Sequence, residues 1–287
     1  KPRLFCMPEI LMQAPAGEPI HLSEAKLHLR VTDDGQDVLI RSMLAGARQA
    51  AEQKTRQQLL HARYQYVIDR FPVPGAAPAC GVVSIPPSAI VLPRAPVVDV
   101  VKVEYLDMAG ELQTLDASVY TVQNAMLPGI ITPRFGEIWP VARPESGAVR
   151  VTYNAGYASP VSVVAASSGT FRISGPVAYP VRAVVQFYNS GGALPAGLQA
   201  QTNYLIGSAM ASVYTLTDLE GAPVVFTDNG SGSNFIGVVP EGLRNWILIR
   251  LGSLYENREE VAFLTRGGIK ELPFIDGLLD PYRISLP

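Results

Sequence analysis

The amino-acid sequence predicts an α+β fold, in which a helical bundle with a small antiparallel sheet is interrupted by an inserted all-β domain of the barrel or sandwich type. Two regions repeat apolar residues with the 3.6-residue period of a helix, and most of the chain between them alternates like short strands. A third observation is a sharp fall in charge over residues 158–237. The 287 residues suffice for about two domains.

The fall in charge marks the inserted domain. Charged residues make up 17% of the chain, below the roughly 25% of an ordinary soluble domain. Between Tyr157 and Gly237 the charged residues are Arg172, Arg182, Asp218, Glu220 and Asp228, with no lysine among them. A composition step of this kind predicts a separate domain over 158–237.

The rest of the chain divides around this insert. Residues 1–19 contain four prolines, which restrict the backbone to extended conformations and predict an extended N-terminal arm. A mixed helical and β core is expected over 20–157 and 238–270. The apolar segment 271–287 is expected to dock on another surface as a C-terminal tail.

Two helices are expected near the start of the core. Ser23 is expected to cap a short helix that ends near Leu29. A longer helix follows, with Arg48–Glu52 and Glu52–Arg56 as (i, i+4) pairs away from its apolar face. That face consists of Ile40, Met43, Leu44, Ala47 and Ala51.

A third helix is expected from Pro240, a residue that suits the first helical position. It is predicted to end near residues 258–260. Its apolar face consists of Leu243, Trp246, Ile247, Leu251 and Leu254.

Short β-branched segments predict the strands. In the core they are expected at 63–69, 82–85, 97–106, 111–115, 120–122 and 148–153, with a hairpin connection at 107–110. In the insert they are expected at 183–188, 204–206, 212–216 and 224–226.

Charge, cysteines and histidines exclude several classes of protein. The net charge of −2 lacks the basic excess of a sequence-reading DNA-binding protein. Cys6 and Cys80 form neither a disulfide framework nor a zinc motif. His21, His28 and His61 lack metal-ligand spacing and lie beside no evident nucleophile, so surface or interface roles are favoured over catalysis.

Two polar segments admit a binding interpretation and a structural one. Residues 33–37 invite calcium binding but lack the alternating ligands and closing glutamate of a calcium loop, so a role in capping the long helix is favoured. Residues 228–234 could hold an ion or a sugar, but tight turns use the same residues. Nucleotide-binding and hydrolase motifs are absent from the sequence. We therefore predict no enzyme activity, no metal and no cofactor.

The sequence gives no indication of a membrane partner. It contains no stretch of the roughly 18 apolar residues that a membrane span requires. Residues 1–7 resemble the start of a signal peptide, but Pro8 and Glu9 interrupt the apolar run. A soluble, non-secreted protein is expected.

Several strings in a shared order resemble the phage head–tail connector family labelled phiE125 gp8-like, which is similar to the ring-forming gp6-type adaptors. The resemblance covers most of 17–157 and 239–285, and it departs from the family pattern in the roughly 80 residues that precede Pro240. Those residues resemble a small β-domain of phage structural proteins. The strings are residues 18–31, 66–72, 92–97, 103–107, 148–157, 239–244, 254–259 and 278–283.

This resemblance implies a structural connector, without enzyme activity, in a tailed bacteriophage. Such a protein forms a homo-oligomeric ring, a dodecamer, beneath the portal protein, extends the DNA channel and offers a platform to the next neck or tail protein. Genomic DNA passes through the lumen without sequence-specific binding. The implied location is the head–tail junction of the virion, and the host cytoplasm during assembly.

The resemblance also points to eight interface residues with subunits or the portal. Four of these residues stand at the C-terminal end of the third helix, where they contact a neighbouring subunit or terminate the helix: Tyr255, Glu256, Asn257 and Arg258. The other lies in the tail, which anchors in the portal or folds back on its own bundle: Leu279, Pro281, Tyr282 and Arg283.

A different class of function is compatible with the same sequence. The protein would then be a virion decoration or binding module whose β-insert recognises a glycan or a capsid surface. A hydrolase would need a cluster of acid, base or nucleophile, which the sequence does not indicate.

Overall fold

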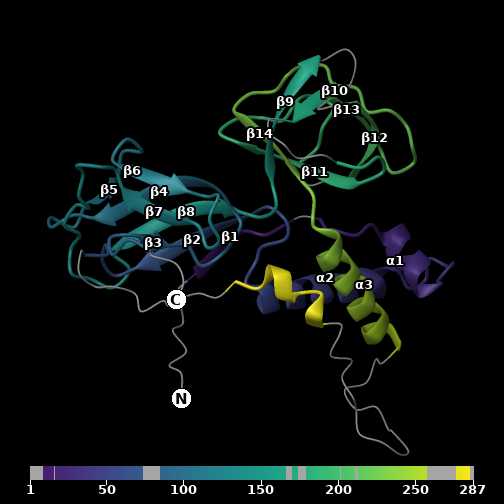
Figure 1. Cartoon of the computed structure of the whole chain (residues 1–287), viewed down its shortest axis with the longest axis horizontal. Coiled ribbons are helices and arrows are strands. Elements are labelled where there is room, and N and C mark those ends of the chain that lie inside the picture. Colours follow the sequence, from purple (N-terminus) through teal and green to yellow (C-terminus); the bar gives the residue numbers. More distant parts are fainter. Residues whose placement is uncertain are drawn as a thin grey trace, which may run out of the picture. The chain divides into compact units, whose positions relative to one another are not determined.

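The computed structural model describes residues 9–15, 17–73, 85–165, 170–173, 179–200, 202–210, 213–256 and 276–284 (Figure 1). The chain forms two compact units. The first comprises Lys1–Ala14, Arg56–Gly156 and Ile284–Pro287, and the second comprises Pro15–Thr55 and Tyr157–Arg283. The core expected over 20–157 and 238–270 is thus divided between the two units. The physical reason is that the sheets bury a core of their own, whereas the helices pack on one another.

The first unit contains two antiparallel sheets. The order of the larger sheet is β1-β2-β8-β4-β5, with β1 at Glu9–Gln13, β2 at Ala62–Ile68, β8 at Val149–Ala155, β4 at Val97–Leu106 and β5 at Leu112–Thr114. The order of the smaller sheet is β3-β7-β6, with β3 at Ile90–Val91, β7 at Ile130–Pro133 and β6 at Tyr120–Gln123.

Alternating side chains from these strands fill the core of the first unit. In β2 every second residue is buried through Ala62, Tyr64 and Tyr66, which is the period that a strand with one covered face requires. Tyr153 in β8 is fully buried, and Phe71 stacks on Trp139 with ring centroids 5.0 Å apart. Apolar burial therefore holds this unit together.

Two expectations about the first unit can be compared with its strands. The predicted hairpin at 107–110 is confirmed, because β4 pairs with β5 around a turn in which the Asp107 carboxylate accepts hydrogen bonds from the backbone N–H groups of Ala109 and Glu111. The described part of the predicted arm, from residue 9, forms the edge strand β1, paired with β2. Of the strand predicted at 82–85, residues 82–84 lie outside the described residues.

The second unit contains a closed antiparallel barrel in the order β10-β13-β12-β11-β14-β9 (Figure 1). The strands are β9 at Ser159–Ala165, β10 at Thr170–Ile173, β11 at Val184–Ser190, β12 at Tyr204–Met210, β13 at Val213–Thr217 and β14 at Ser233–Gly237. The strand predicted at 224–226 is wrong. Phe226 is buried, but this segment contributes only a backbone hydrogen bond from Val224 to Leu216, and the last strand starts at Ser233.

Three helices complete the second unit: α1 at Leu22–Leu29, α2 at Asp37–Thr55 and α3 at Glu241–Glu256. The predicted apolar faces of α2 and α3 turn inward, and the two helices pack against each other. The N-cap of α1 is His21 and not Ser23, because the His21 Nδ1 atom accepts the N–H of Ser23. None of the helices described in the structure is long and apolar enough to cross a membrane.

Candidate interaction sites

A buried arginine of α2 holds the segment that precedes α1. Arg48 donates from Nε to Glu18 at 2.8 Å and from Nη1 to Glu52 at 2.8 Å. Both Arg48 and Glu52 are buried, at 7% and 6% exposure. The predicted placement of the Arg48–Glu52 pair away from the apolar face is therefore wrong. Arg48 follows Leu44 by four residues, which places it in the same buried stripe.

A second buried arginine, from α3, holds the same segment. Arg244 donates from Nη1 to the carbonyl oxygen of Pro19 at 3.1 Å, and its Nη2 lies 2.9 and 2.8 Å from the two carboxylate oxygens of Glu24. Two arginines from different helices thus bind one short segment of chain. We call residues 17–24 the clamped segment.

The barrel also contacts the clamped segment. Gln186 and Asn203 each direct a side-chain amide to the carbonyl oxygen of Glu18, at 3.3 and 3.4 Å. The Gln186 amide also donates to the Asn203 Oδ1 atom at 2.6 Å, and the Tyr188 hydroxyl donates to the Gln186 Oε1 atom at 2.6 Å. Polar groups of the barrel therefore fix the backbone of the segment.

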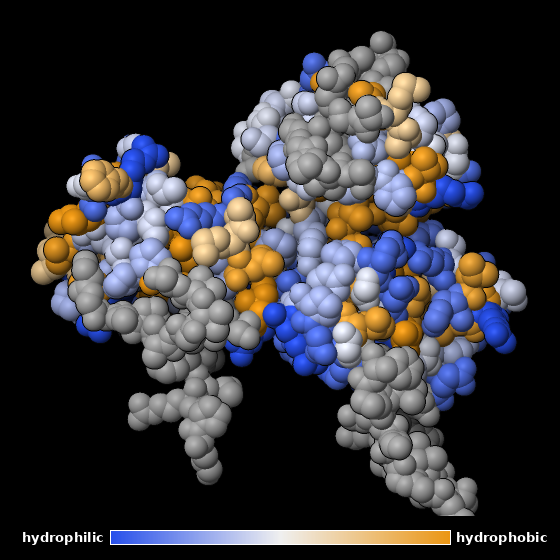
Figure 2. All heavy atoms as spheres, in the orientation of Figure 1, coloured by the Kyte–Doolittle hydropathy of each residue, from blue (hydrophilic) through white to orange (hydrophobic). Residues whose placement is uncertain are grey.

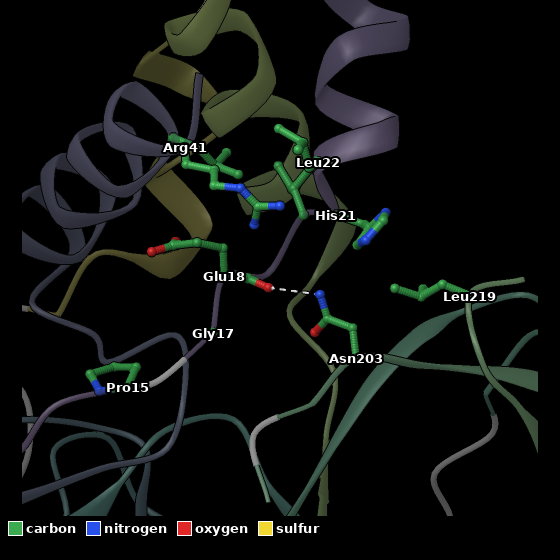
Figure 3. A pocket seen from close by; sticks show the side chains of 10 residues that line it. Pro15, Gly17, Glu18, His21, Leu22, Arg41, Asn203 and Leu219 are labelled. Carbon is green, nitrogen blue, oxygen red and sulfur yellow. Dashed lines mark hydrogen bonds between the residues drawn. The ribbon is translucent and has the colours of Figure 1, made fainter. Parts of the chain in front are cut away.

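A cavity of about 330 Å³ lies beside the clamped segment. Figure 3 shows the side chains of Arg41 and Glu18 on the helical side of this cavity, with Asn203 on the barrel side and His21 near Leu219. The lining combines one exposed cation, one carboxylate already bound by Arg48 and several apolar groups. This set of groups is able to bind a partner side chain, and it has no nucleophile paired with a base.

Burial shifts the pKa values of the titratable groups at this cavity. Desolvation raises the pKa of Glu18 above its ordinary value, and the neighbouring Arg48 opposes the shift. Desolvation and the positive charge of Arg41 lower the pKa of His21, which favours the neutral ring that caps α1. Neither shift places an acid or base beside a reactive group.

A second cavity, of about 440 Å³, lies along α1 and the start of α2 and shares His21, Leu22 and Arg41 with the first. At its rim Lys26 Nζ lies 2.5 Å from Asp34 and 2.9 Å from Asp37. The acidic residues 33–37 thus bind a lysine, and Asp37 is the first residue of α2. Within the described residues no group of three possible metal ligands occurs.

The described part of the C-terminal tail folds against the helices of its own chain. Asp276 accepts hydrogen bonds from Lys54 of α2 at 2.6 Å and from Trp246 of α3 at 3.3 Å. Leu279 is fully buried, and the Tyr282 ring lies against Gly242, at whose position an added Cβ would be 3.0 Å from the ring. Residues 276–283 thus pack on the helices of their own chain, and the predicted contact of the tail with the portal stays a prediction.

The remaining predicted interface residues lie at the surface or outside the described part. Pro281 is exposed, as is Arg283, which pairs with Asp280 at 3.1 Å. Tyr255 donates its hydroxyl to Gln36 at 2.9 Å, and Glu256 is exposed at the end of α3. Asn257 and Arg258 lie outside the described residues, as does the predicted end of this helix.

The other histidines are separate from these cavities and from each other. His28 is exposed on α1 near Gly252 of α3, whereas His61 is buried in the first unit. Burial lowers the pKa of His61 to about 4. The positive charge of Arg63 also lowers this pKa, and the negative charge of Asp99 raises it. His61 is therefore neutral near pH 7.

The sequence interpretation missed the burial of Arg48, its bond to Glu18 and the pair of Arg244 with Glu24. Glu18 and Glu24 belong to the first string that carries the family resemblance, and Arg244 belongs to the string 239–244. The available signal was the helical spacing of Arg48 after Leu44 and the position of Arg244 next to Leu243. An arginine in an apolar stripe needs an acidic partner, because an unpaired buried charge is costly.

Comparisons with known proteins agree with the resemblance found in the sequence. Residues 19–122 match the family model of the phage gp6-like head-tail connector protein. A search among curated proteins finds no relative.

Two solved structures resemble the chain over most of its length. One is the neck of an empty GTA particle computed with C6 symmetry, with 15% identity and a TM-score of 0.55 over 98% of this chain and 97% of that chain. The other is the virion of a native gene transfer agent particle, with 15% identity, a TM-score of 0.54 and the same coverage. An alignment without the barrel residues would cover less than three quarters of the chain, so the likeness includes the barrel.

The family match and the structural likeness cover different extents of the chain. The match includes most of the clamped segment, α1, α2, the strands β2 to β5 and most of β6, and the shared fold extends to the barrel and α3. These findings confirm the resemblance predicted from the sequence: residues 19–122 carry the signature of the phage gp6-like head–tail connector family, and the whole chain shares its fold with a chain of a gene transfer agent particle.

Proposed function

We propose that this protein is a structural head–tail connector of a tailed phage or phage-like particle. The observation that carries the proposal is the connector-family match over residues 19–122, which contains most of the clamped segment around which the helices are built. The protein acts by binding and not by catalysis. It assembles in the host cytoplasm and resides at the head–tail junction of the virion.

In this role the protein forms a ring, a dodecamer, beneath the portal protein and presents a platform to the next neck or tail protein. The similar GTA neck, computed with C6 symmetry, supports a cyclic arrangement. A net charge of −2 suits a channel that genomic DNA traverses, because a basic lining would retain the phosphates.

The barrel is an inserted β-domain in this proposal, placed between β8 and α3 of the connector. Its contacts with Glu18 through Gln186 and Asn203 support a fixed position on the helices. Such a position suits a structural part of a neck.

The tail contributes to the portal contact through its exposed face. Leu279 anchors the tail on its own helices, which leaves Pro281 and Arg283 accessible to the portal. At the end of α3, Tyr255 and Glu256 are proposed to contact a neighbouring subunit. The same role is proposed for Asn257 and Arg258, which follow them in the sequence.

Deletion of the gene for this chain from the genome that encodes the particle tests the proposal. We expect DNA-filled heads and separate tails, with joining restored by the wild-type chain supplied in trans. Reconstruction of the restored necks by electron microscopy should show the chain as a twelvefold ring at the distal face of the portal. Complete particles without the chain, or restored necks with no density for it, would refute the proposal.

A further inference from the structure

The loop that follows β7 displays three apolar side chains to solvent. Phe135, Ile138 and Val141 have exposures of 105%, 82% and 76%. The space-filling view shows that hydrophobic residues, in orange, reach the surface of the first unit at several places (Figure 2). Single exposed apolar residues are ordinary, but three within seven residues indicate a contact surface. We call residues 134–141 the apolar loop.

The apolar loop is held in its position by backbone and side-chain bonds. Glu137 N–H donates to the Arg134 carbonyl at 2.9 Å, and Gly136 has a φ of +88° in the third position of this turn, which places Phe135 at its tip. Trp139 points inward, where it stacks on Phe71 and donates to the Ser88 carbonyl at 2.6 Å. Exposure of Phe135 is therefore a built feature of the loop.

The second unit offers a surface of opposite shape. The second cavity lies along α1 and the start of α2, and it shares His21, Leu22 and Arg41 with the first. Leu22, Leu27 and Val31 provide apolar walls, and Leu27 is 80% exposed at the rim. We call this surface the α1 groove.

Charges at the two surfaces are complementary. Arg134 and Glu137 flank Phe135 and are exposed, and the rim of the α1 groove carries the carboxylates of Asp34 and Asp37 and the guanidinium of Arg41. Within the described residues neither Arg134 nor Glu137 nor Arg41 makes an ion pair. Arg41 is therefore available to pair with Glu137, and Arg134 can join the cluster of Asp34 and Asp37, whose carboxylates Lys26 already binds.

The small area of the apolar loop favours a contact that is repeated among many copies of the chain. An aromatic side chain buries about 150–250 Å², so the three side chains offer on the order of 400 Å², about half of the roughly 800 Å² that each partner of a stable complex buries. Such a contact is too weak for a stable pair of free chains. It gains strength when a scaffold brings many copies side by side.

We propose that the apolar loop of one copy of this chain docks in the α1 groove of the next copy, with Phe135 inserted between Leu22, Leu27 and Val31. Because the two surfaces differ, the contact is heterologous and repeats around a closed ring. The inference rests on the proposed connector function, which supplies the ring, and it names the surfaces by which subunits meet.

Disulfide trapping between two single variants tests this contact. Both variants are full-length chains in which Cys6 and Cys80 are replaced by serine, one with Ile138→Cys on the loop and the other with Leu27→Cys on the groove. After mixing in a glutathione redox buffer, the product that joins the two variants is quantified by mass spectrometry. The matched control replaces Leu27→Cys by Met210→Cys, since Met210 is 81% exposed on the barrel.

We expect the joined product to exceed the control product and both self-joined products by about tenfold, and Phe135→Asp on the loop variant to remove this excess. Equal yields with Met210→Cys would overturn the proposal. A larger yield of the Ile138→Cys chain joined to itself would also overturn it, because that result indicates an isologous contact.

The same pair of variants, incorporated into particles, separates this inference from the proposed function. If necks contain the chain but the joined product does not exceed the control, the subunit contact is wrong and the connector function stands. If the joined product forms in the purified mixture but particles lack the chain, the contact stands and the connector function is wrong.

Discussion

In the first unit, apolar and aromatic side chains such as Tyr153 fill the core beneath two sheets, whereas in the second unit two buried arginines bind the clamped segment. Apolar packing accepts many side chains of similar volume. A buried arginine requires its particular acidic partners, because an unpaired charge loses its hydration without compensation. The side chains of Glu18 and Glu24 are therefore fixed by their bonds to the arginines more than by their size.

The chain contains a means to observe each unit separately. Its two tryptophans are divided, with Trp139 in the first unit and Trp246 in the second. A Trp139→Phe background therefore reports unfolding of the second unit by fluorescence, and a Trp246→Phe background reports the first.

Replacement of the clamping arginine should have the largest effect. Arg48→Met removes the guanidinium from the buried Glu52 and the half-buried Glu18, which we expect to lower the free energy of unfolding of the second unit by about 3–5 kcal/mol. Urea denaturation in the Trp139→Phe background measures this loss. Arg41→Met, an exposed arginine on the same helix, serves as the control and should change stability by less than about 0.5 kcal/mol.

The pH dependence of this effect sharpens the test. Loss of Arg48 should raise the pKa of Glu18 further, and a carboxyl with a raised pKa destabilises the fold as the pH rises through that value. The variant should therefore lose more stability at pH 7 than at pH 4.5. A loss that is independent of pH would indicate that Arg48 acts through packing alone.

Acid should act on the first unit through His61. Its pKa is lowered to about 4 by burial, so its stabilising contribution is complete above pH 6.5 and is lost as the pH falls through 4. The full loss amounts to about 3 kcal/mol. Denaturation at pH 7 and pH 4.5 in the Trp246→Phe background measures most of this loss, because pH 4.5 still lies above the lowered pKa, and His61→Gln should flatten the difference. If His61→Gln keeps the same difference between the two pH values as His28→Gln, an exposed control, this assignment fails.

Release of the tail should have a smaller and local effect. Leu279→Ala removes a fully buried side chain from the tail, which we expect to cost about 2 kcal/mol and to expose the backbone of residues 276–283. Hydrogen exchange of the Leu279 N–H, which donates to the Asp276 carbonyl at 3.0 Å, reports the opening. Pro281→Ala, at an exposed position, should leave that exchange unchanged, and equal acceleration in both variants would contradict a packed tail.

The cap of α1 should have the smallest effect. His21→Ala removes the acceptor for the Ser23 N–H and should cost about 1 kcal/mol in the second unit. His21→Asn, which restores a capping oxygen, should recover most of the loss. Ser23→Ala should cost less than His21→Ala, and the reverse order would favour the cap predicted from the sequence.

Local patterns predicted much of the fold. The apolar faces of α2 and α3, the hairpin at 107–110 and most of the strands follow from spacing and turn residues within a few positions of one another. The errors occurred where distant residues decide. The helical period allows the Arg48 side chain to face either solvent or the protein interior. Its burial is explained by Glu18, which lies thirty residues earlier in the chain.

The periods of the helices and strands, the low charge of residues 158–237 and the strings that resemble a connector family follow from the sequence alone, because each is a property of neighbouring residues. The closure of six strands into a barrel, the bonds of Arg48 and Arg244 to the clamped segment and the burial of Leu279 became visible in the folded chain. These features join residues far apart in the chain, and their free energies depend on burial and pairing that no local pattern specifies.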